Sequence, residues 1–316
     1  MDANRDKAVA FIIGPTAVGK THLSLKISEK YDIEIISADS RQIYKYMDIG
    51  TAKPTPEELH GVPHHFIDIK FPDEYYSAGK FGKEARSRID DIIARDKIPL
   101  VVGGAGFYVK ALAEGLFEAE IHDARVKQKL RNEVVEKGLA ELYERLKRVD
   151  PQSAARIHAN DKQRILRALE VWEISRTPLS KYHQEDEVTS NFNAVYFGLT
   201  TDRSLLYRRI EKRVDDMIRD GLVEEVKSIM EKGYSEDLSS LQTVGYKEVF
   251  QYFHGALSRD EMIALIKQNS RNYAKRQMTW FRKNKEIEWY DIHNTECFNK
   301  VISDIETFHK KHTFKN

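Results

Sequence analysis

The sequence predicts an α/β protein in which a parallel sheet carries a mostly helical insertion. A buried strand, a glycine-rich loop and a helix follow one another at the start of the chain. Further apolar strands then alternate with helices, as expected when helices cover both faces of a parallel sheet. A long, highly charged helical stretch interrupts this alternation near the middle of the chain, and a strand resumes after it.

The glycine-rich loop spans Gly14–Thr21 and has the form G-x-x-x-x-G-K-[ST], which is a phosphate-binding loop. The apolar run Ala8–Ile13 precedes it as a buried strand, and His22–Tyr31 follows it as a helix. In such a loop, backbone N–H groups and the N-terminus of the helix face an anion. Lys20 can reach the terminal phosphates, and the hydroxyl of Thr21 can ligate Mg²⁺. The motif therefore predicts a P-loop NTPase- or kinase-like sheet, but it does not identify the reaction.

Two further strands are expected to end near this loop. The strand Ile33–Ser37 leads to Asp39, and ligands of open parallel sheets lie beyond the carboxyl ends of the strands. An Asp here is equally typical of a helix N-cap, so the residue type alone leaves both roles open. The strand Ile98–Val102 ends in Gly103-Gly104, where most phosphate-loop nucleotidases carry an acid that helps to hold Mg²⁺. This difference disfavours an ATPase, and small residues let another molecule approach the backbone closely.

Between these two strands the sequence predicts a loop, a short strand and a helix. A glycine and two prolines mark Met47–Pro56 as a loop. Pro63–Ile69 is typical of a short strand, and its paired histidines, His64 and His65, have no further ligand at metal-binding spacing. Structural roles are therefore favoured for both. Ser77–Arg95 carries apolar residues at helical spacing.

The helical insertion is expected over residues 119–193, and residues 1–118 plus 194–316 are expected to form the catalytic core. Asp123–Lys147 is a highly charged helical stretch, and Asp150-Pro151 interrupts it. More helix follows up to Ile174.

After the insertion the chain returns to strands and helices. Strands are predicted at Val195–Leu199 and Ile287–Asp291. Between them, the helix Arg203–Arg219 carries Arg209 and Arg213 on one face, because they are four residues apart.

A last long helix, Arg259–Asn284, is locally basic. The segment Met262–Lys285 contains no Asp or Glu, although the whole chain has a net charge of only +1. Lys267, Arg271 and Lys275 step by four along the helix and are expected to form a basic stripe that contacts nucleic acid.

Composition excludes several classes of protein. A hydrophobic content of 41% is ample for a core. No apolar run approaches the ~20 residues that span a membrane, and Met1–Lys7 does not resemble a secretory signal. The single cysteine, Cys297, allows neither an internal disulfide nor a cysteine metal cluster. The expected location is the cytoplasm.

Several motifs beyond the phosphate-binding loop are more specific than the loop itself. They are S-A-D-S-R-Q-I-Y at Ser37–Tyr44, M-D-I-G-T-A-K-P at Met47–Pro54, L-V-V-G-G at Leu100–Gly104, D-K-Q-R-I-L-R-A-L-E at Asp161–Glu170, V-G-Y-K-E at Val244–Glu248 and Y-A-K-R-Q-M-T-W-F-R at Tyr273–Arg282. Together they resemble the tRNA dimethylallyltransferase family, also called tRNA isopentenyltransferase, over nearly the whole chain. The lack of cysteines for a zinc finger is typical of the shorter bacterial members.

The resemblance implies transfer of a dimethylallyl group from dimethylallyl diphosphate to N6 of adenine 37 in tRNA, beside the anticodon. Asp39 would be the general base, with Lys20, Thr21 and Arg213 acting on the leaving diphosphate and Mg²⁺ held by Thr21. The resemblance assigns the diphosphate or nucleotide to Gly14, Pro15, Thr16, Ala17, Val18, Gly19, Lys20, Thr21 and Arg209. It assigns tRNA contacts to Asp39, Ser40, Arg41, Gln42, Ala105, Lys127, Gln163, Arg164, Ile165, Leu166, Arg167, Val244, Gly245, Tyr246, Lys247, Lys275 and Arg276.

One position departs from the family pattern, because Ala105 stands where the family has Thr and cannot make a side-chain hydrogen bond. Three other functions remain as alternatives. An adenylate dimethylallyltransferase would share the loop and Asp39 but would need no helical insertion. A small-molecule kinase would be expected to keep an acid near Gly103. A non-catalytic RNA-binding module would leave the phosphate-binding loop unexplained. A monomer is expected.

Overall fold

The computed structural model of the chain describes residues 7–116, 121–185, 192–294 and 296–313. The chain divides into two compact units. The core unit consists of Met1–Tyr76, Glu84–Val109 and Ser190–Asn316, and the helical unit consists of Ser77–Lys83 and Lys110–Thr189. The helical unit thus takes in two short stretches of chain that precede the predicted insertion.

The core unit contains a parallel sheet, as predicted. Its six strands lie in the order β3-β2-β4-β1-β5-β6. Their bounds are β1 Ala8–Ile13, β2 Ile33–Ala38, β3 His64–His65, β4 Ile98–Gly103, β5 Asn193–Thr200 and β6 Ile287–Asp291. Ile13 lies opposite Gly103 on one side and Gly198 on the other, and Ala38 also lies opposite Gly103. The carboxyl ends of the central strands therefore meet at one edge, where open α/β sheets bind ligands.

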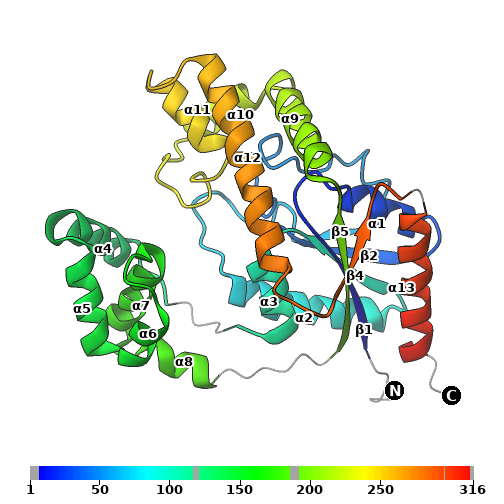
Figure 1. The fold of residues 1–316 in the computed structure, drawn as a ribbon, viewed down its shortest axis with the longest axis horizontal. Helices are drawn as coiled ribbons and strands as arrows, with labels where there is room; N and C mark the ends of the chain where they lie inside the picture. The colour runs from blue at the N-terminus through cyan, green and yellow to red at the C-terminus, as the bar shows by residue number, and fades with distance from the viewer. Residues whose placement is uncertain (1–6, 117–120, 186–191, 295, 314–316) are drawn as a thin grey trace. The chain divides into compact units, whose positions relative to one another are not determined.

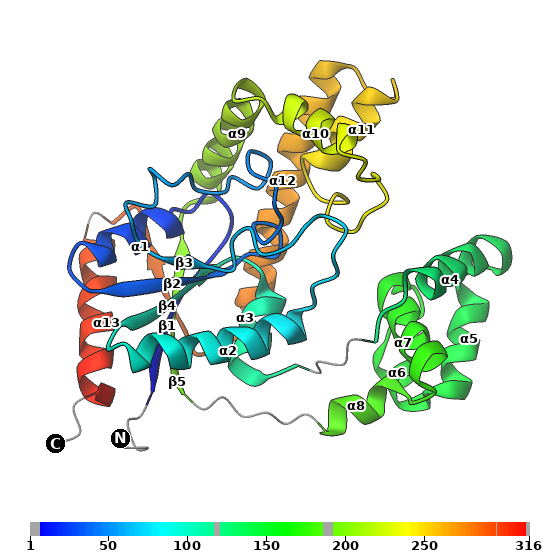
Figure 2. The ribbon, with the colours of Figure 1, turned by 180° about the vertical axis from the view of Figure 1, so that it is seen from behind.

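Every residue of β1 and β2 is buried, because helices cover both faces of this sheet. Helices α1 (Lys20–Ser28) and α13 (Cys297–Thr313) pack on one face, where Leu23 and Val301 join the same apolar core. Helix α2 (Ala78–Ala94) lies on the other side of the sheet (Figures 1 and 2). This layered arrangement confirms the predicted P-loop NTPase-like α/β class.

Helix α3 (Gly106–Glu114) begins in the core unit and ends in the helical unit. The remaining helices of the core unit are α9 (Arg203–Arg219), α10 (Leu222–Glu231), α11 (Tyr246–Phe253) and α12 (Arg259–Phe281). Helices α9 and α12 contact each other, and both rise from the carboxyl edge of the sheet (Figure 1). Among the residues that the structure describes, no helix is long and apolar enough to cross a membrane.

The described residues of the helical unit pack around a core of their own. Its helices are α4 (Ala124–Lys137), α5 (Leu139–Val149), α6 (Pro151–Arg156), α7 (Lys162–Ser175) and α8 (Leu179–Glu185). Leu130, Leu146 and Leu169 belong to this core.

The charged helical stretch predicted over Asp123–Lys147 is present, but it consists of two helices, α4 and α5. Gly138 divides it, since its φ of 83° and ψ of 157° are incompatible with a helix and accessible chiefly to glycine. The turn lets α4 and α5 lie against each other. Helix α13 was not predicted, since the last element expected from the sequence is the strand Ile287–Asp291.

The close approach of β2 and β4 leads to a prediction about stability. A Cβ atom at Gly103 would lie 2.1 Å from the carbonyl oxygen of Ala38, which is backbone and cannot move aside cheaply. We expect Gly103→Ala to lower the free energy of unfolding by several kcal/mol, on the order of 2–4. Urea denaturation monitored by circular dichroism measures this quantity.

Gly61→Ala is the matched control. Gly61 has a φ of +75° and no neighbouring atom within 4 Å of the added Cβ. Gly61→Ala should therefore lower the free energy of unfolding by only about 1–2 kcal/mol, which is the cost of a left-handed backbone conformation for alanine. Equal losses in the two variants would contradict the close contact as the cause.

Candidate active site

The phosphate-binding loop has the backbone geometry that the motif predicts. Gly14 and Gly19 have φ values of 148° and 103°, and a Cβ on Gly14 would lie 2.7 Å from the carbonyl oxygen of Leu199. Helix α1 begins directly after Gly19, which provides no side-chain cap. The N–H groups of the first turn are therefore available to an anion at this end of the helix.

Two cations lie beside this loop. Lys20 Nζ donates to the carbonyl oxygens of Gly14 and Pro15, at 3.0 and 2.8 Å. Burial lowers the pKa of Lys20 to about 8, although the nearby Asp39 opposes the shift, and Arg213 contributes to it. The guanidinium of Arg213 donates to the hydroxyl of Thr16 at 3.1 Å. Helix α9 thus places a second positive charge over the loop.

Asp39 follows β2 at the same edge of the sheet. Its Oδ1 accepts hydrogen bonds from the backbone N–H groups of Arg41 and Gln42, at 2.8 and 3.4 Å. The carboxylate therefore caps a turn over residues 40–43, whereas the N-cap role left open by the sequence would need a helix there. It also lies close enough to Lys20 and Arg213 to influence both of their pKa values. An ionised carboxylate has about four acceptor positions, so two backbone donors do not exhaust it.

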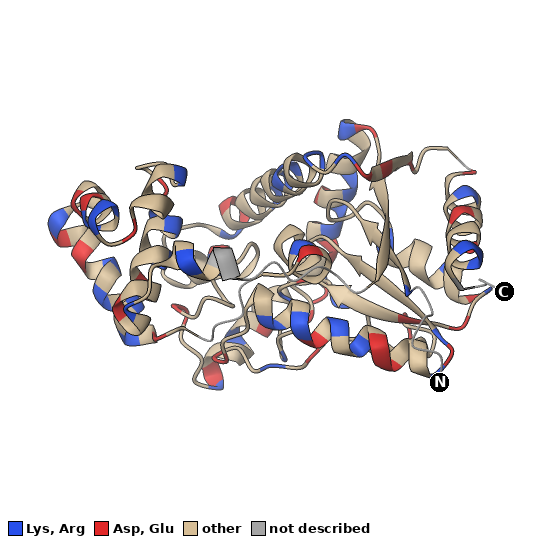
Figure 3. Cartoon of the chain, turned by 90° about the horizontal axis from the view of Figure 1, so that it is seen from below, with Lys and Arg blue, Asp and Glu red and all other residues tan. Residues whose placement is uncertain are grey.

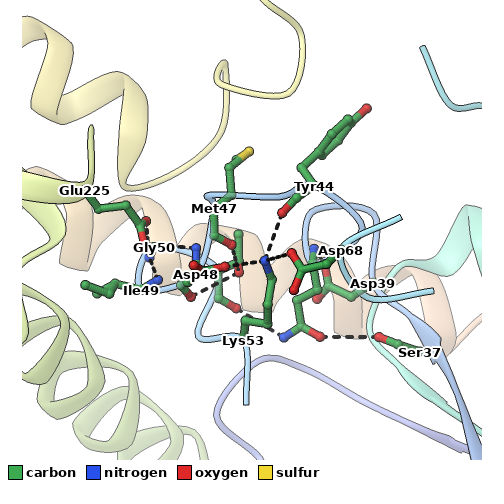
Figure 4. A network of polar contacts seen from close by, with 12 residues as sticks. Ser37, Asp39, Tyr44, Met47, Asp48, Ile49, Gly50, Lys53, Asp68 and Glu225 are labelled. Carbon is green, nitrogen blue, oxygen red and sulfur yellow. Dashed lines mark hydrogen bonds and ion pairs between the residues drawn. The ribbon is translucent and has the colours of Figure 1, made fainter. Parts of the chain in front are cut away.

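The M-D-I-G-T-A-K-P loop, residues 47–54, is held in place by ionic and polar contacts (Figure 4). Lys53 Nζ, only 5% exposed, binds the carboxylates of Asp48 and Asp68 and the carbonyl oxygen of Tyr44. Gln42 Nε2 donates to the carbonyl oxygens of Thr51 and Ala52. The loop is therefore fixed to the segment that follows Asp39.

Glu225 of α10 holds the other side of the same loop. Its two carboxylate oxygens accept from the backbone N–H groups of Asp48, Ile49 and Gly50, at 2.6–3.1 Å. The hydroxyl of Tyr246 donates to the same carboxylate at 2.6 Å. Because the Tyr246 side chain is fully buried, the RNA contact predicted for this residue would have to come from its backbone. The side chain positions the loop instead.

Gln277 of α12 connects the phosphate-binding loop to the end of β4. Its Oε1 accepts from the N–H of Thr16 at 2.9 Å, and its Nε2 donates to the carbonyl oxygen of Gly104 at 3.0 Å. An added Cβ at position 104 would lie 2.3 Å from Nε2 of Gln277, so a larger residue there would displace this amide. Tyr273, one turn earlier on α12, has a raised pKa because of burial and the proximity of Asp39.

A cavity of about 390 Å³ lies where these segments of the core unit meet. Such a volume is ordinary for a small-ligand site. The residues that line it include Thr16, Lys20, Thr21, Ser37, Asp39, Ser40, Arg41, Gln42, Thr51, Gly104, Arg213, Val244, Gly245, Lys247, Tyr273, Arg276 and Gln277. The structure thus brings together most of the predicted residues of the core. Arg209 is exposed and is not among the lining residues, although it shares α9 with Arg213.

The cavity fits a Mg²⁺ ion that is bound mainly through its substrate. Thr21 is exposed to the cavity and offers a hydroxyl, and Asp39 offers a carboxylate nearby. The described residues contain no group of three or more His, Cys, Asp or Glu side chains that could hold a metal ion. Mg²⁺ commonly needs only one or two protein ligands when phosphate oxygens and water supply the rest.

The predicted RNA-contacting residues of the helical unit have different environments. Ile165 is fully buried in the core of this unit, so its side chain cannot contact RNA as predicted. Leu166 packs against the same core. Gln163 and Arg164 are exposed. Arg167 donates to the carbonyl oxygen of Ile121 and to the buried carboxylate of Glu170, and Lys127 has a pKa lowered by burial.

The basic stripe of α12 is partly neutralised. Lys267 pairs with Asp215 at 2.6 Å, and Arg271 pairs with Glu211 at 2.6 Å, both across to α9. Two members of the predicted basic stripe are therefore paired with acids of another helix, and this reduces the charge that they present. Lys275 and Arg276, nearer the sheet, are exposed. Over the described chain, basic and acidic residues alternate along the ribbon (Figure 3), in keeping with the net charge of +1.

Comparison with known proteins identifies the family of the chain. The family described as IPP transferase matches residues 42–284. The chain is 46% identical to the tRNA dimethylallyltransferase of Geobacillus thermodenitrificans, over 94% of both chains. It is also 46% identical to that of Carboxydothermus hydrogenoformans, over 94% of this chain and 95% of the relative.

Solved structures give the same result. The tRNA isopentenylpyrophosphate transferase of Bacillus halodurans has a TM-score of 0.71 and 39% identity, with 97% of this chain and 98% of that chain covered. A eukaryotic dimethylallyltransferase acting on tRNA has a TM-score of 0.81 and 28% identity, with 98% and 81% covered. The predicted resemblance is confirmed. The chain is similar to these tRNA dimethylallyltransferases and belongs to the IPP transferase family.

Proposed function

We propose that this protein transfers the dimethylallyl group of dimethylallyl diphosphate to N6 of adenine 37 in tRNA. The observation that carries the proposal is the arrangement of Asp39, Lys20 and Arg213 around one cavity. Two cations and a helix N-terminus suit a diphosphate, and a carboxylate next to them suits an acceptor that must lose a proton.

The reaction exchanges one bond for another. The bond between C1 of the dimethylallyl group and its diphosphate oxygen breaks, and both electrons leave with the diphosphate. A bond forms between C1 and N6 of adenine, and one N6 proton goes to Asp39. The exocyclic amine is a poor nucleophile because its lone pair is delocalised into the ring, so removal of this proton during attack assists the transfer.

The phosphate-binding loop and two cations stabilise the leaving group. Diphosphate gains negative charge as the C–O bond breaks, and preorganised donors at that point lower the barrier. Lys20 would move from the carbonyl oxygens of the loop to the diphosphate. Arg213 already reaches Thr16 and needs no large movement. Mg²⁺, held by Thr21 and the diphosphate oxygens, would supply further neutralisation of charge.

The adenine must leave the stack of the anticodon loop to reach Asp39. Ser40, Arg41 and Gln42 line the cavity next to Asp39. Arg41 also donates to the carbonyl oxygen of Ser239 at 2.8 Å. This bond ties the adenine side of the cavity to the loop that carries Val244 and Gly245 and leads into α11, where Lys247 lies. Ala105 can contribute through its backbone alone.

Contacts with the rest of the tRNA are proposed on both units. On the core unit, Lys247, Lys275 and Arg276 would bind phosphates, which position the RNA without reading its sequence. On the helical unit, Gln163, Arg164, Arg167 and Lys127 provide the polar and basic side chains. The helical unit distinguishes this proposal from an enzyme that modifies free AMP, which would not need it.

We predict that Asp39→Ala lowers kcat by about 10²–10⁴-fold, with a smaller change in the KM for the donor. The carboxylate acts as the amine loses its proton, so its contribution belongs to the transition state. Asp39→Asn still accepts the two backbone hydrogen bonds and should retain tRNA binding better than turnover. Steady-state kinetics with each substrate varied in turn measure both effects. The control is Asp220→Ala, which removes an exposed acid beyond α9. A normal kcat in Asp39→Ala would leave Asp39 only its turn-capping role.

We also predict that inorganic diphosphate binds with uptake of a proton above pH 8. Below that pH Lys20 is charged in both the free and the bound protein, so its titration has no effect. Above it, the free protein has lost the proton, because its pKa is about 8, whereas a bound anion restores the higher value. Affinity should fall by up to about tenfold per pH unit more in the wild type than in Lys20→Met. Calorimetry at pH 7 to 9.5 tests this, and identical pH profiles would refute the assignment.

The exposed end of α12 generates a prediction about salt. Each phosphate contact contributes about −0.7 to −0.9 to the slope of log K against log salt concentration. Lys275→Ala combined with Arg276→Ala should weaken tRNA binding and flatten this slope by about 1.5, without changing the affinity for diphosphate. Lys310→Ala with Lys311→Ala, an exposed basic pair on α13, is the control. If Lys275→Ala combined with Arg276→Ala left the slope unchanged, α12 would have no role in tRNA binding.

A further inference from the structure

Phe107 at the start of α3 and the half-buried Trp280 of α12 form a pair of aromatic rings. Phe107 is 54% exposed, more than any other aromatic side chain among the described large hydrophobics of the surface. Its ring lies against the indole of Trp280, with centroids 4.6 Å apart and planes inclined by 40°. Neither residue has a role in the phosphate-binding loop or in the contacts around Asp39.

The backbone is adapted to this pair. A Cβ atom at Gly106 would lie 2.2 Å from Cδ1 of Trp280. Glycine at this position therefore lets the indole rest directly on the first turn of α3. Phe107, the next residue, then covers the indole from the solvent side.

Helices α3 and α12, which carry Phe107 and Trp280, place the two rings beside the cavity. Ala105 donates its N–H to the carbonyl oxygen of Ala38, the residue before Asp39. Trp280 lies one turn beyond Gln277 on α12, and a turn of helix rises ~5.4 Å. Since Gln277 lines the cavity, the aromatic pair lies near its rim, on the side of the acid.

The charge around the pair suits RNA. Lys275 and Arg276 are exposed on the preceding turn of α12. The segment Met262–Lys285 has no Asp or Glu that would repel a phosphate. Aromatic faces next to basic side chains are the usual means of binding unstacked bases.

We infer that Phe107 and Trp280 form a stacking platform for a nucleotide adjoining the flipped adenine. This inference rests on the proposed function. When the target adenine leaves the loop, its neighbour loses a stacking partner on one side. The ring of Phe107 replaces that partner and holds the neighbouring base while the adenine occupies the cavity.

A fluorescent anticodon stem-loop tests the platform. The probe carries 2-aminopurine next to the target adenine, because stacking on an aromatic ring quenches its fluorescence. Wild-type protein should quench the probe on binding. Phe107→Ser should abolish the quenching and raise the KM for tRNA about tenfold, whereas Phe107→Tyr should retain both. The donor KM and the melting temperature should stay unchanged, because the Phe107 side chain is largely exposed. Phe71→Ser, which removes an exposed ring over Lys45, is the control.

Three outcomes would overturn the inference. Equal quenching and tRNA KM in wild type and Phe107→Ser would remove the platform. A raised KM for the donor alone would assign the rings to the dimethylallyl tail. If the wild type transferred no dimethylallyl group to an unlabelled stem-loop, the proposed function would fail and the platform with it. If the wild type transfers the group normally and Phe107→Ser has the same quenching and tRNA KM as the wild type, the platform is refuted and the proposed function stands.

Discussion

The buried amide of Gln277 is the interaction on which the site depends most. It satisfies one group of the phosphate-binding loop and one at the end of β4 at the same time. A buried amide that lost either partner would cost about 1–3 kcal/mol, so the two segments have one favourable spacing. Thr16 then reaches Arg213, and Gly104 follows the residue that pairs with Ala38. The diphosphate side and the acid side of the cavity are thereby held at a fixed separation.

A second set of contacts adds the loop of residues 47–54 to this frame. Glu225 binds three successive backbone N–H groups of that loop, and Lys53 neutralises two carboxylates beside it. Because Arg213 donates to the carbonyl oxygen of Thr51 at 3.3 Å, the loop orients the guanidinium as well as closing the cavity. The specific motif at residues 47–54 is thus explained by positioning rather than by contact with the reacting atoms.

The sequence predicted what depends on local pattern. The phosphate-binding loop, the buried strands and the place of Asp39 follow from apolar runs and from the rule that ligands bind beyond parallel strands. Contacts between distant segments were not predictable in this way. The acids that pair with Lys267 and Arg271 lie on another helix. Gln277 stood within the Tyr273–Arg282 motif, which could have drawn attention to it, but Glu225 carried no local signal. Tyr246 and Ile165 were assigned to RNA from motif membership, whereas their burial is set by tertiary packing.

The central claim is that one cavity of the core unit joins a diphosphate to an adenine that must be presented by tRNA. Labelled dimethylallyl diphosphate offered with an anticodon stem-loop, with AMP or with no acceptor tests it most directly. The account predicts that label is incorporated into the stem-loop at N6 of the adenine beside the anticodon, and that diphosphate is released in equal amount. Incorporation into AMP at a comparable rate would contradict the account, and so would release of diphosphate that does not depend on an acceptor.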